Sequence, residues 1–235
     1  MQKVLLIMTV LTSLSMSLPL SLNPDSASAR TAASAAATLQ RVLAKPLILG
    51  ASVSADHSSP SPGKKLALAH TSAHAIRTIA FGGRPSLQVL PHLKPEGLKD
   101  RSIVIAVDLF FWDSLLPSPQ ASVGALEDLL GRVKERGIPL VLGNIPNLMP
   151  ALQPSRSALN QAMEKACRDY DKCMILPFDS FLQRLLREGS LTYENRRYSY
   201  RELLPDGLHV GPVGSAYLGQ KIAELLTLTL DSAAG

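Results

Sequence analysis

Short apolar runs alternate with longer amphipathic segments from residue 46 onward, and this alternation constrains the fold more than any other feature of the sequence. Five short runs are bounded by Gly, Pro, Asp or Asn: 47–49, 76–81, 103–107, 139–142 and 174–178. Three longer segments carry apolar residues at spacings of three and four: 126–136, 155–167 and 214–230. The first pattern is typical of buried strands and the second of amphipathic helices.

Strands that are apolar on both faces and separated by helices indicate an α/β fold. Such strands need helices above and below them, joined by right-handed crossovers. We therefore expect a three-layer sandwich with a mostly parallel, doubly wound, five-stranded sheet and helices on both faces. The chain has 235 residues, 46% of them hydrophobic, which suits one core of this size. Ligands of such sheets bind beyond the carboxyl ends of the strands, so chemistry is expected in the loops that follow them.

Residues 1–29 have the pattern of a signal peptide. Lys3 supplies the positive end, an apolar run follows, and Ala27-Ser28-Ala29 is a small-residue cleavage site. The apolar run contains several Thr and Ser residues and is short for a bilayer span, so we expect cleavage rather than retention as an anchor. The mature protein is predicted to be periplasmic or secreted, without stable membrane insertion.

The rest of the chain is predicted to form one domain. Residues 30–45 are rich in Ala, Ser and Thr, and are expected to be either a disordered leader or a first helix that packs through Leu39, Val42 and Leu43. The domain proper then spans 46–235. The net charge of +5 is spread along the chain rather than gathered in a stripe. Nucleic-acid binding is therefore not expected.

Cysteine and histidine spacing bears on cross-links and metals. Cys167 and Cys173 flank a short polar segment between a predicted helix and a predicted strand. They form either a disulfide, as an oxidising compartment permits, or two unpaired thiols. His70 and His74 are four apart on what we expect to be a helix, a spacing that can bind metal. No third ligand stands nearby, so no metal site is predicted.

A serine and an acid–histidine pair stand in the loops where chemistry is expected. Ser52 lies in the small-residue turn 50–54, directly after the first predicted strand. A serine hydroxyl needs a base to accept its proton and an acid to orient that base. Asp206 and His209 supply both, because they are three apart in a turn that Gly207 makes possible.

Each of these signals is weak alone. A serine in such a turn usually caps a helix, and an Asp-Gly-x-His turn is more often a hydrogen-bonded loop than an active site. Their order favours a triad, because the nucleophile follows the first strand while acid and base precede the last helix. His57 is the alternative base, but the Ser-Pro-Ser-Pro stretch after it indicates an exposed loop.

These blocks resemble those of the SGNH, or GDSL-like, hydrolases, which carry a Gly-Asp-Ser-Leu-type turn near the start and an Asp-x-x-His turn near the end. The resemblance covers most of 46–230, with Ala51 in place of the family's aspartate. It implies the flavodoxin-like fold of that family, with Ser52 as nucleophile, His209 as general base and then acid, and Asp206 as its orienting partner. No cofactor is implied.

The family's middle blocks supply oxyanion donors, a glycine amide and an asparagine side chain. By the resemblance, the amides of Ser52 and Gly83 are donors, with Gly82 as the near alternative. The third block departs from the family, because Asp108 stands where asparagine is expected. Asp108 is then either protonated, or binds a substrate hydroxyl, or orients a neighbouring loop. Losing one oxyanion donor typically costs about 10²–10³ in turnover, and Asn144, after the fourth strand, is a substitute donor.

Four residues near these loops are predicted to contact substrate: Trp112, Asn144, Arg197 and Tyr198. Aromatic faces and guanidinium groups suit sugar rings or acidic glycans, and an aromatic wall suits an acyl chain. The alternatives are core packing for Trp112 and a solvated basic segment for Arg197 and Tyr198.

The leading hypothesis is an exported serine hydrolase that cleaves carboxylic esters through a Ser-His-Asp triad. Its expected partner is an ester-containing small molecule, a lipid or an acylated glycan. One alternative is a cell-envelope glycan acyltransferase, in which a sugar hydroxyl replaces water. The other is a non-catalytic glycan- or lipid-binding module whose oxyanion hole is degenerate at Asp108.

Overall fold

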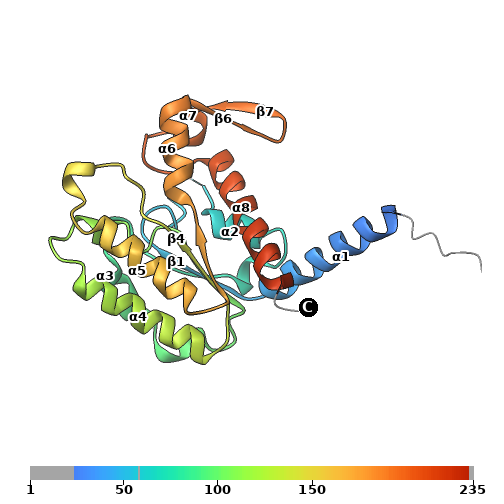
Figure 1. Ribbon diagram of the computed structural model, residues 1–235, viewed down its shortest axis with the longest axis horizontal. Coiled ribbons are helices and arrows are strands. Elements are labelled where there is room, and N and C mark those ends of the chain that lie inside the picture. Colours follow the sequence, from blue (N-terminus) through green and yellow to red (C-terminus); the bar gives the residue numbers. More distant parts are fainter. Residues whose placement is uncertain (1–23, 58, 233–235) are drawn as a thin grey trace, which may run out of the picture.

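The computed structural model describes residues 24–57 and 59–232. Its centre is a five-stranded sheet in the order β2-β1-β3-β4-β5, with every pairing parallel. The strands are β1 (Pro46–Gly50), β2 (Arg77–Ala80), β3 (Ile103–Ala106), β4 (Leu140–Gly143) and β5 (Cys173–Leu176). The predicted three-layer α/β sandwich is confirmed (Figure 1).

Helices cover both faces of the sheet. One face carries α3 (Ser86–Val89), α4 (Gln120–Glu135) and α5 (Arg156–Arg168). The other carries the end of α1 (Pro24–Val42) together with α2 (Pro62–Ala67), α6 (Phe178–Glu188) and α8 (Pro212–Ser232). A hairpin of β6 (Ser190–Tyr193) and β7 (Arg196–Ser199) and the short α7 (Tyr200–Leu203) lie between α6 and α8 in the chain. Short 3₁₀ turns are η1 (Ala73–Ala75), η2 (Leu90–His92), η3 (Pro95–Leu98), η4 (Trp112–Leu115) and η5 (Pro150–Leu152).

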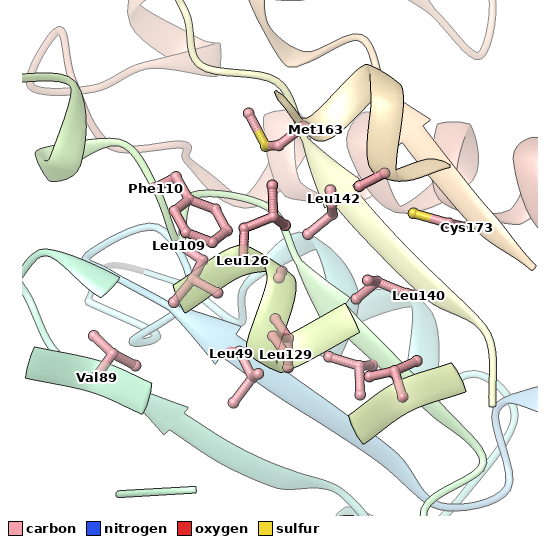
Figure 2. Packing of buried hydrophobic residues seen from close by; sticks show 14 of the residues in the cluster. Leu49, Val89, Leu109, Phe110, Leu126, Leu129, Leu140, Leu142, Met163 and Cys173 are labelled. Atoms are coloured by element: carbon pink, nitrogen blue, oxygen red, sulfur yellow. The ribbon is translucent and has the colours of Figure 1, made fainter. Parts of the chain in front are cut away.

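Successive strand residues point to two separate cores. Leu47 and Leu49 pack on the α4 and α5 side, whereas Ile48 between them packs on the α6 and α8 side. Figure 2 shows the first core, where Leu126 of α4 and Leu140 of β4 lie among the buried side chains. Because alternate strand residues point to opposite faces and both faces are covered, β1, β3, β4 and β5 carry no polar side chain, whereas the edge strand β2 has Arg77 and Thr78 exposed.

The strand order determines where a ligand can bind. From β1 the chain adds β2 on one side of the sheet and then β3, β4 and β5 on the other side. The direction in which strands are added therefore reverses between β1 and β3. In sheets of this order the crevice lies at the carboxyl ends of those two strands. Ser52 follows β1 and Asp108 follows β3, so both stand at this edge.

Two sequence predictions about elements are wrong. The fifth apolar run ends as a strand at Leu176, and Phe178 begins α6 instead, because Pro177 has no N–H to continue a ladder. His70 and His74 do not share a helix, since α2 ends at Ala67 and His74 lies on η1.

The N-terminal predictions fall partly outside the described residues. The first 23 residues of the predicted signal peptide lie outside them, and its cleavage site lies within α1, most of which projects from the sandwich (Figure 1). Val42 and Leu43 are buried against the sheet, and Leu39 packs beside them. In the part of the chain that the structure describes, no helix combines the length and apolarity needed to cross a bilayer.

Candidate active site

The loop that carries Ser52 is fastened to the end of β3 by Asp108. The backbone N–H of Ala51 donates to Oδ1 of Asp108 at 3.0 Å, and that of Val53 donates to Oδ2 at 2.7 Å. The Ser54 hydroxyl donates to Oδ1 at 2.6 Å. The residues on both sides of Ser52 are therefore held by one carboxyl group, while Ser52 itself is half-buried at the edge of the sheet.

Burial and hydrogen bonding act in opposite directions on Asp108. Burial raises the pKa of the Asp108 carboxyl, and the bonds from Ser54, Val53 and Ala51 lower it without cancelling the rise. Gly50 is required beside this group, since a Cβ there would lie 2.2 Å from Oδ1 of Asp108. Of the three roles considered for Asp108, the geometry matches the orienting one. Two of its three partners are N–H groups, which can only donate, so its oxygens face the loop of Ser52 as acceptors.

The backbone N–H groups around Ser52 differ in their partners. Among the described residues, the N–H of Ser52 has no acceptor, although those of Ala51 and Val53 both have one. A Cβ built on Gly82 would lie 3.8 Å from Cβ of Ser52, whereas one built on Gly83 would meet nothing within 4 Å. Gly82, the alternative considered above, is thus the glycine that borders Ser52.

Asp206 and His209 form a pair in the turn before α8. Oδ2 of Asp206 lies 2.6 Å from Nδ1 of His209, and Oδ1 accepts the backbone N–H groups of Leu208 and His209 at 3.0 and 2.7 Å. These bonds, led by those from His209, hold the pKa of the Asp206 carboxyl well below its usual range. Gly207 has φ +82°, and its carbonyl accepts a hydrogen bond from the Tyr200 hydroxyl at 3.0 Å.

The loop that follows β1 and carries Ser52 lies beside the turn that carries His209. The rings of His57 and His209 are 5.4 Å apart between centroids, and the Ser59 hydroxyl donates to the Val210 carbonyl at 3.3 Å. Among the described residues no hydrogen bond joins the Ser52 hydroxyl to His209. Catalytic hydrogen bonds are often long before substrate binds, so proximity of the two loops is the relevant observation.

A narrow pocket opens beside Ser52. Its apolar lining comes from the loops after β3 and β4, from α6 and from the histidine turn: Phe111, Pro146, Leu148, Phe178, Leu182 and Leu208. Val53 and Asp108 complete the wall. The pocket thus joins Ser52 and the residue next to His209 in one cavity.

None of the four predicted substrate residues lines this pocket. Asn144 accepts the N–H of Asp179 at 2.8 Å and so holds the first turn of α6. Trp112 packs edge-on against Phe111 at 5.3 Å, and it is Phe111 that lines the pocket.

Arg197 and Tyr198 belong to the hairpin. Nε of Arg197 donates to the Ser190 hydroxyl at 2.7 Å, and the ring of Tyr198 lies under the Arg196 guanidinium at 4.7 Å. Neither residue lines the pocket beside Ser52. Nearness in sequence to the Asp206 turn therefore does not bring them to Ser52.

Sequence reasoning missed several buried polar groups that fix the surrounding loops. Asp113 accepts the N–H and the hydroxyl of Ser86 at 2.7 and 2.6 Å, and the Ser122 hydroxyl at 2.6 Å. Oε1 of Gln153 accepts the N–H groups of Leu148 and Met149, which places one wall of the pocket. No short-range motif marks these residues, because each acts through partners that its spacing does not reveal.

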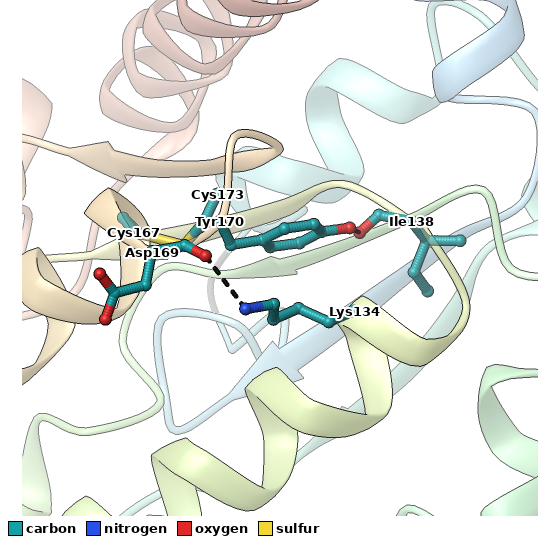
Figure 3. The surroundings of a disulfide bond; sticks show 6 residues. All are labelled: Lys134, Ile138, Cys167, Asp169, Tyr170 and Cys173. Carbon is teal, nitrogen blue, oxygen red and sulfur yellow. Dashed lines mark hydrogen bonds between the residues drawn. A yellow bond between two sulfur atoms is a disulfide. The ribbon is translucent and has the colours of Figure 1, made fainter.

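Cys167 and Cys173 are joined by a disulfide with a Cα–Cα distance of 4.6 Å (Figure 3). Between them, the Tyr170 hydroxyl donates to the Ile138 carbonyl at 2.7 Å, and burial raises the pKa of Tyr170 to about 12. Cys173 begins β5, so the bond lies at the amino end of the sheet, opposite the edge with Ser52. Among the described residues, no group of three or more His, Cys, Asp or Glu is arranged to hold a metal ion.

Solved structures resemble the chain over most of its length. A lipase/acylhydrolase from Enterococcus faecalis matches with TM-score 0.53 and 18% identity, over 78% of this chain and 95% of that one. The esterase EstA from a Pseudoalteromonas species matches with TM-score 0.56 and 15% identity, over 79% and 98%. A GDSL-like lipase from Bacteroides thetaiotaomicron matches with TM-score 0.51 and 13% identity, over 87% and 97%. A scan against protein-family models and a search of curated proteins both find no match.

These likenesses show that the chain has the fold of the SGNH, or GDSL-like, hydrolases. The fold expected from the sequence resemblance is thereby confirmed. Because the identities are below a fifth, the likenesses by themselves establish the fold and not the reaction.

Proposed function

We propose that the protein is an exported serine hydrolase that cleaves carboxylic esters, with Ser52 as nucleophile, His209 as base and Asp206 as the orienting acid. The observation that carries the proposal is the Asp206–His209 pair, which stands beside the loop of Ser52. The fold supports it, since its structural neighbours include proteins described as a lipase/acylhydrolase and an esterase.

The geometry supports a two-step acyl transfer. Nε2 of His209 accepts the Ser52 proton while Oγ of Ser52 attacks the ester carbonyl, and Asp206 holds Nδ1. The N–H groups of Ser52 and of Gly82 or Gly83 stabilise the oxyanion. His209 then protonates the departing alcohol. Water, deprotonated by His209, attacks the acyl-enzyme and releases the acid and a free Ser52 hydroxyl.

Export belongs to the proposal and rests on the sequence of residues 1–29. Their charged start, apolar run and small-residue cleavage site have the signal-peptide pattern. The Cys167–Cys173 bond fits an oxidising compartment. Expression with residues 1–29 intact, followed by N-terminal sequencing of the exported protein, tests this part. A mature chain that starts at Arg30 supports it, and an uncleaved chain retained in the cell contradicts it.

The central experiment is covalent labelling with a fluorophosphonate, which reacts with activated serines whatever the natural ester. One structural neighbour is an esterase inhibited by monoethylphosphonate, which recommends this class of probe. We expect one adduct by intact mass on the wild type, none on Ser52→Ala, and an unchanged adduct on the control Ser157→Ala, an exposed serine on α5. Absence of an adduct on folded wild-type protein would contradict the proposal and favour the binding module.

The two histidines need separate variants. His57 lies beside His209, but only His209 is held by a carboxylate. We expect His209→Ala to abolish labelling and turnover and His57→Asn to retain both. The reverse pattern would make His57 the base. Adding a glycan acceptor to turnover assays then separates hydrolysis from acyl transfer to a sugar hydroxyl.

A further inference from the structure

The pocket beside Ser52 is closed at one end by buried apolar side chains. Phe178 and Leu182 of α6 are 2% and 1% exposed, whereas Leu148 and Leu208 are only partly buried. The first two therefore form its inner wall and the other two its rim. Its enclosed part has room for about one water-sized group.

The chemistry of the lining selects an apolar occupant. Apart from Ser52, the polar group in the wall is Asp108, whose oxygens already accept three hydrogen bonds. A sugar ring or a charged headgroup would be both too large and without hydrogen-bond partners there, and burying such groups unpaired is unfavourable. A small hydrocarbon group needs no partner.

We propose that this pocket receives the acyl side of the ester and limits it to about two or three carbons, so that the substrate is a short-acyl ester such as an acetate. This rests on the proposed function, since the acyl group must sit beside Ser52 during attack. A methyl group is about the size of one water molecule, so an acetyl group fits as the pocket stands. Longer chains must displace Leu182 or Phe178, which the packed core resists.

The alcohol side of the ester is not limited in this way. Phe178 and Leu182 in the pocket wall are buried, whereas Ser52 is half-buried and so lies nearer the surface. If the acyl group fills the closed end, the alcohol must point outwards over the loops. Large alcohols, including acylated sugars, are therefore compatible with the site.

The test measures kcat/KM for two series of esters. In the first, p-nitrophenyl esters carry acyl chains of two to eight carbons; in the second, acetates carry alcohols of increasing size. We expect kcat/KM to fall at least about tenfold between propionyl and hexanoyl esters, since one methylene in an apolar pocket is typically worth 10–200-fold. The acetate series should vary much less.

Two variants and a matched control locate the limit. Leu182→Ala should move the optimum to longer chains, and Leu148→Ala at the rim should do so to a smaller extent without a core cavity. Leu185→Ala is the control, because Leu185 is equally buried on the same helix and does not line the pocket. It should lower stability and leave the chain-length profile unchanged.

The outcomes distinguish this inference from the proposed function. A fluorophosphonate adduct on Ser52 with a flat acyl-chain profile, or with a profile that Leu182→Ala and Leu148→Ala do not move, overturns the inference alone. A steep dependence on alcohol size with none on acyl size also overturns it, because the pocket would then hold the leaving group. No adduct on folded protein overturns both.

Discussion

The substitution Asp108→Asn tests whether Asp108 orients the loop of the proposed nucleophile Ser52 or only stands where an oxyanion donor is expected. In the second case asparagine would supply a side-chain N–H to the oxyanion and raise turnover by about 10²–10³. The structure argues for the first case, because both carboxylate oxygens accept hydrogen bonds from the residues around Ser52.

The expected magnitude follows from the three bonds. The asparagine oxygen can take the place of Oδ1, which accepts from Ala51 and Ser54. Its NH₂ group then faces the N–H of Val53, where the present distance is 2.7 Å, and two donors meet. A buried donor left without an acceptor costs about 1–3 kcal/mol. Asparagine also removes the cost of burying a carboxylate, which offsets part of this penalty. We therefore expect the free energy of unfolding to fall by about 1–2 kcal/mol and the melting temperature to fall by about 2–8 °C.

The assay pairs urea unfolding with kcat/KM on a short-acyl ester. We expect Asp108→Asn to lower the free energy of unfolding and to lower kcat/KM by about tenfold or more, since a small displacement of the attacking group strongly reduces the rate. Asp128→Asn on the exposed side of α4 removes the same charge and should change neither. Raised turnover with unchanged stability would refute the reasoning.

The pH dependence of stability gives a second readout. Burial raises the pKa of Asp108 above its ordinary value of 3.8, so the folded state binds this proton more tightly than the unfolded chain does. The stability that this proton contributes is complete below pH 3.8 and is lost as the pH rises through the folded-state pKa. The stability of the wild type relative to Asp108→Asn should therefore decrease with rising pH. An increase over that range would contradict the raised pKa.

Three further predictions concern single features. Gly50→Ala should lower the free energy of unfolding by about 2 kcal/mol or more and remove most activity, because the new Cβ would lie 2.2 Å from Oδ1 of Asp108, which holds the loop of Ser52. In urea unfolding the control Gly124→Ala, whose Cβ would lie in open space on α4, should be neutral or stabilising. Asp206→Asn should lower kcat at pH 7 by at least about 10², and a loss below threefold would argue against an orienting role. Replacing Cys167 and Cys173 by Ser should lower the free energy of unfolding by about 2 kcal/mol, because the unfolded chain regains the entropy of the loop that the disulfide closes. Thermal melts measure this loss, and phosphonate labelling should stay unchanged.

Strands β1, β3, β4 and β5 could be predicted because coverage on both faces makes each of them a visible apolar run. The edge strand β2 is less marked, since Arg77 and Thr78 are exposed. The β6–β7 hairpin could not be predicted, since it is largely exposed and its pattern is mixed. Its turn is formed by Glu194 and Asn195, both at positive φ, and the pair Glu-Asn does not predict that conformation. The start of α6 was misassigned because apolar residues continue across Pro177, and composition alone does not separate the end of a strand from the first turn of a helix.

The candidate site was predictable where local spacing carries the geometry. Asp206 and His209 pair within one turn, so their contact is encoded over four residues. Asp108 acts on residues more than fifty positions away, and its role emerges only when β1 and β3 become neighbours. Whether Trp112 or Phe111 reaches the pocket depends on the backbone of the loop after β3, which hydrophobicity does not reveal.

The two halves of the site are held in different ways, and this separates stability from rate. The loop of Ser52 is held by Asp108, which is buried, so a substitution of Asp108 disturbs the edge of the core as well as the position of Ser52. The side chain of Asp206 is 53% exposed and holds His209 from the surface. Exposed pairs contribute little to stability. Variants of Asp206 and His209 should therefore fold like the wild type and lose rate alone, whereas variants around Asp108 should lose both together.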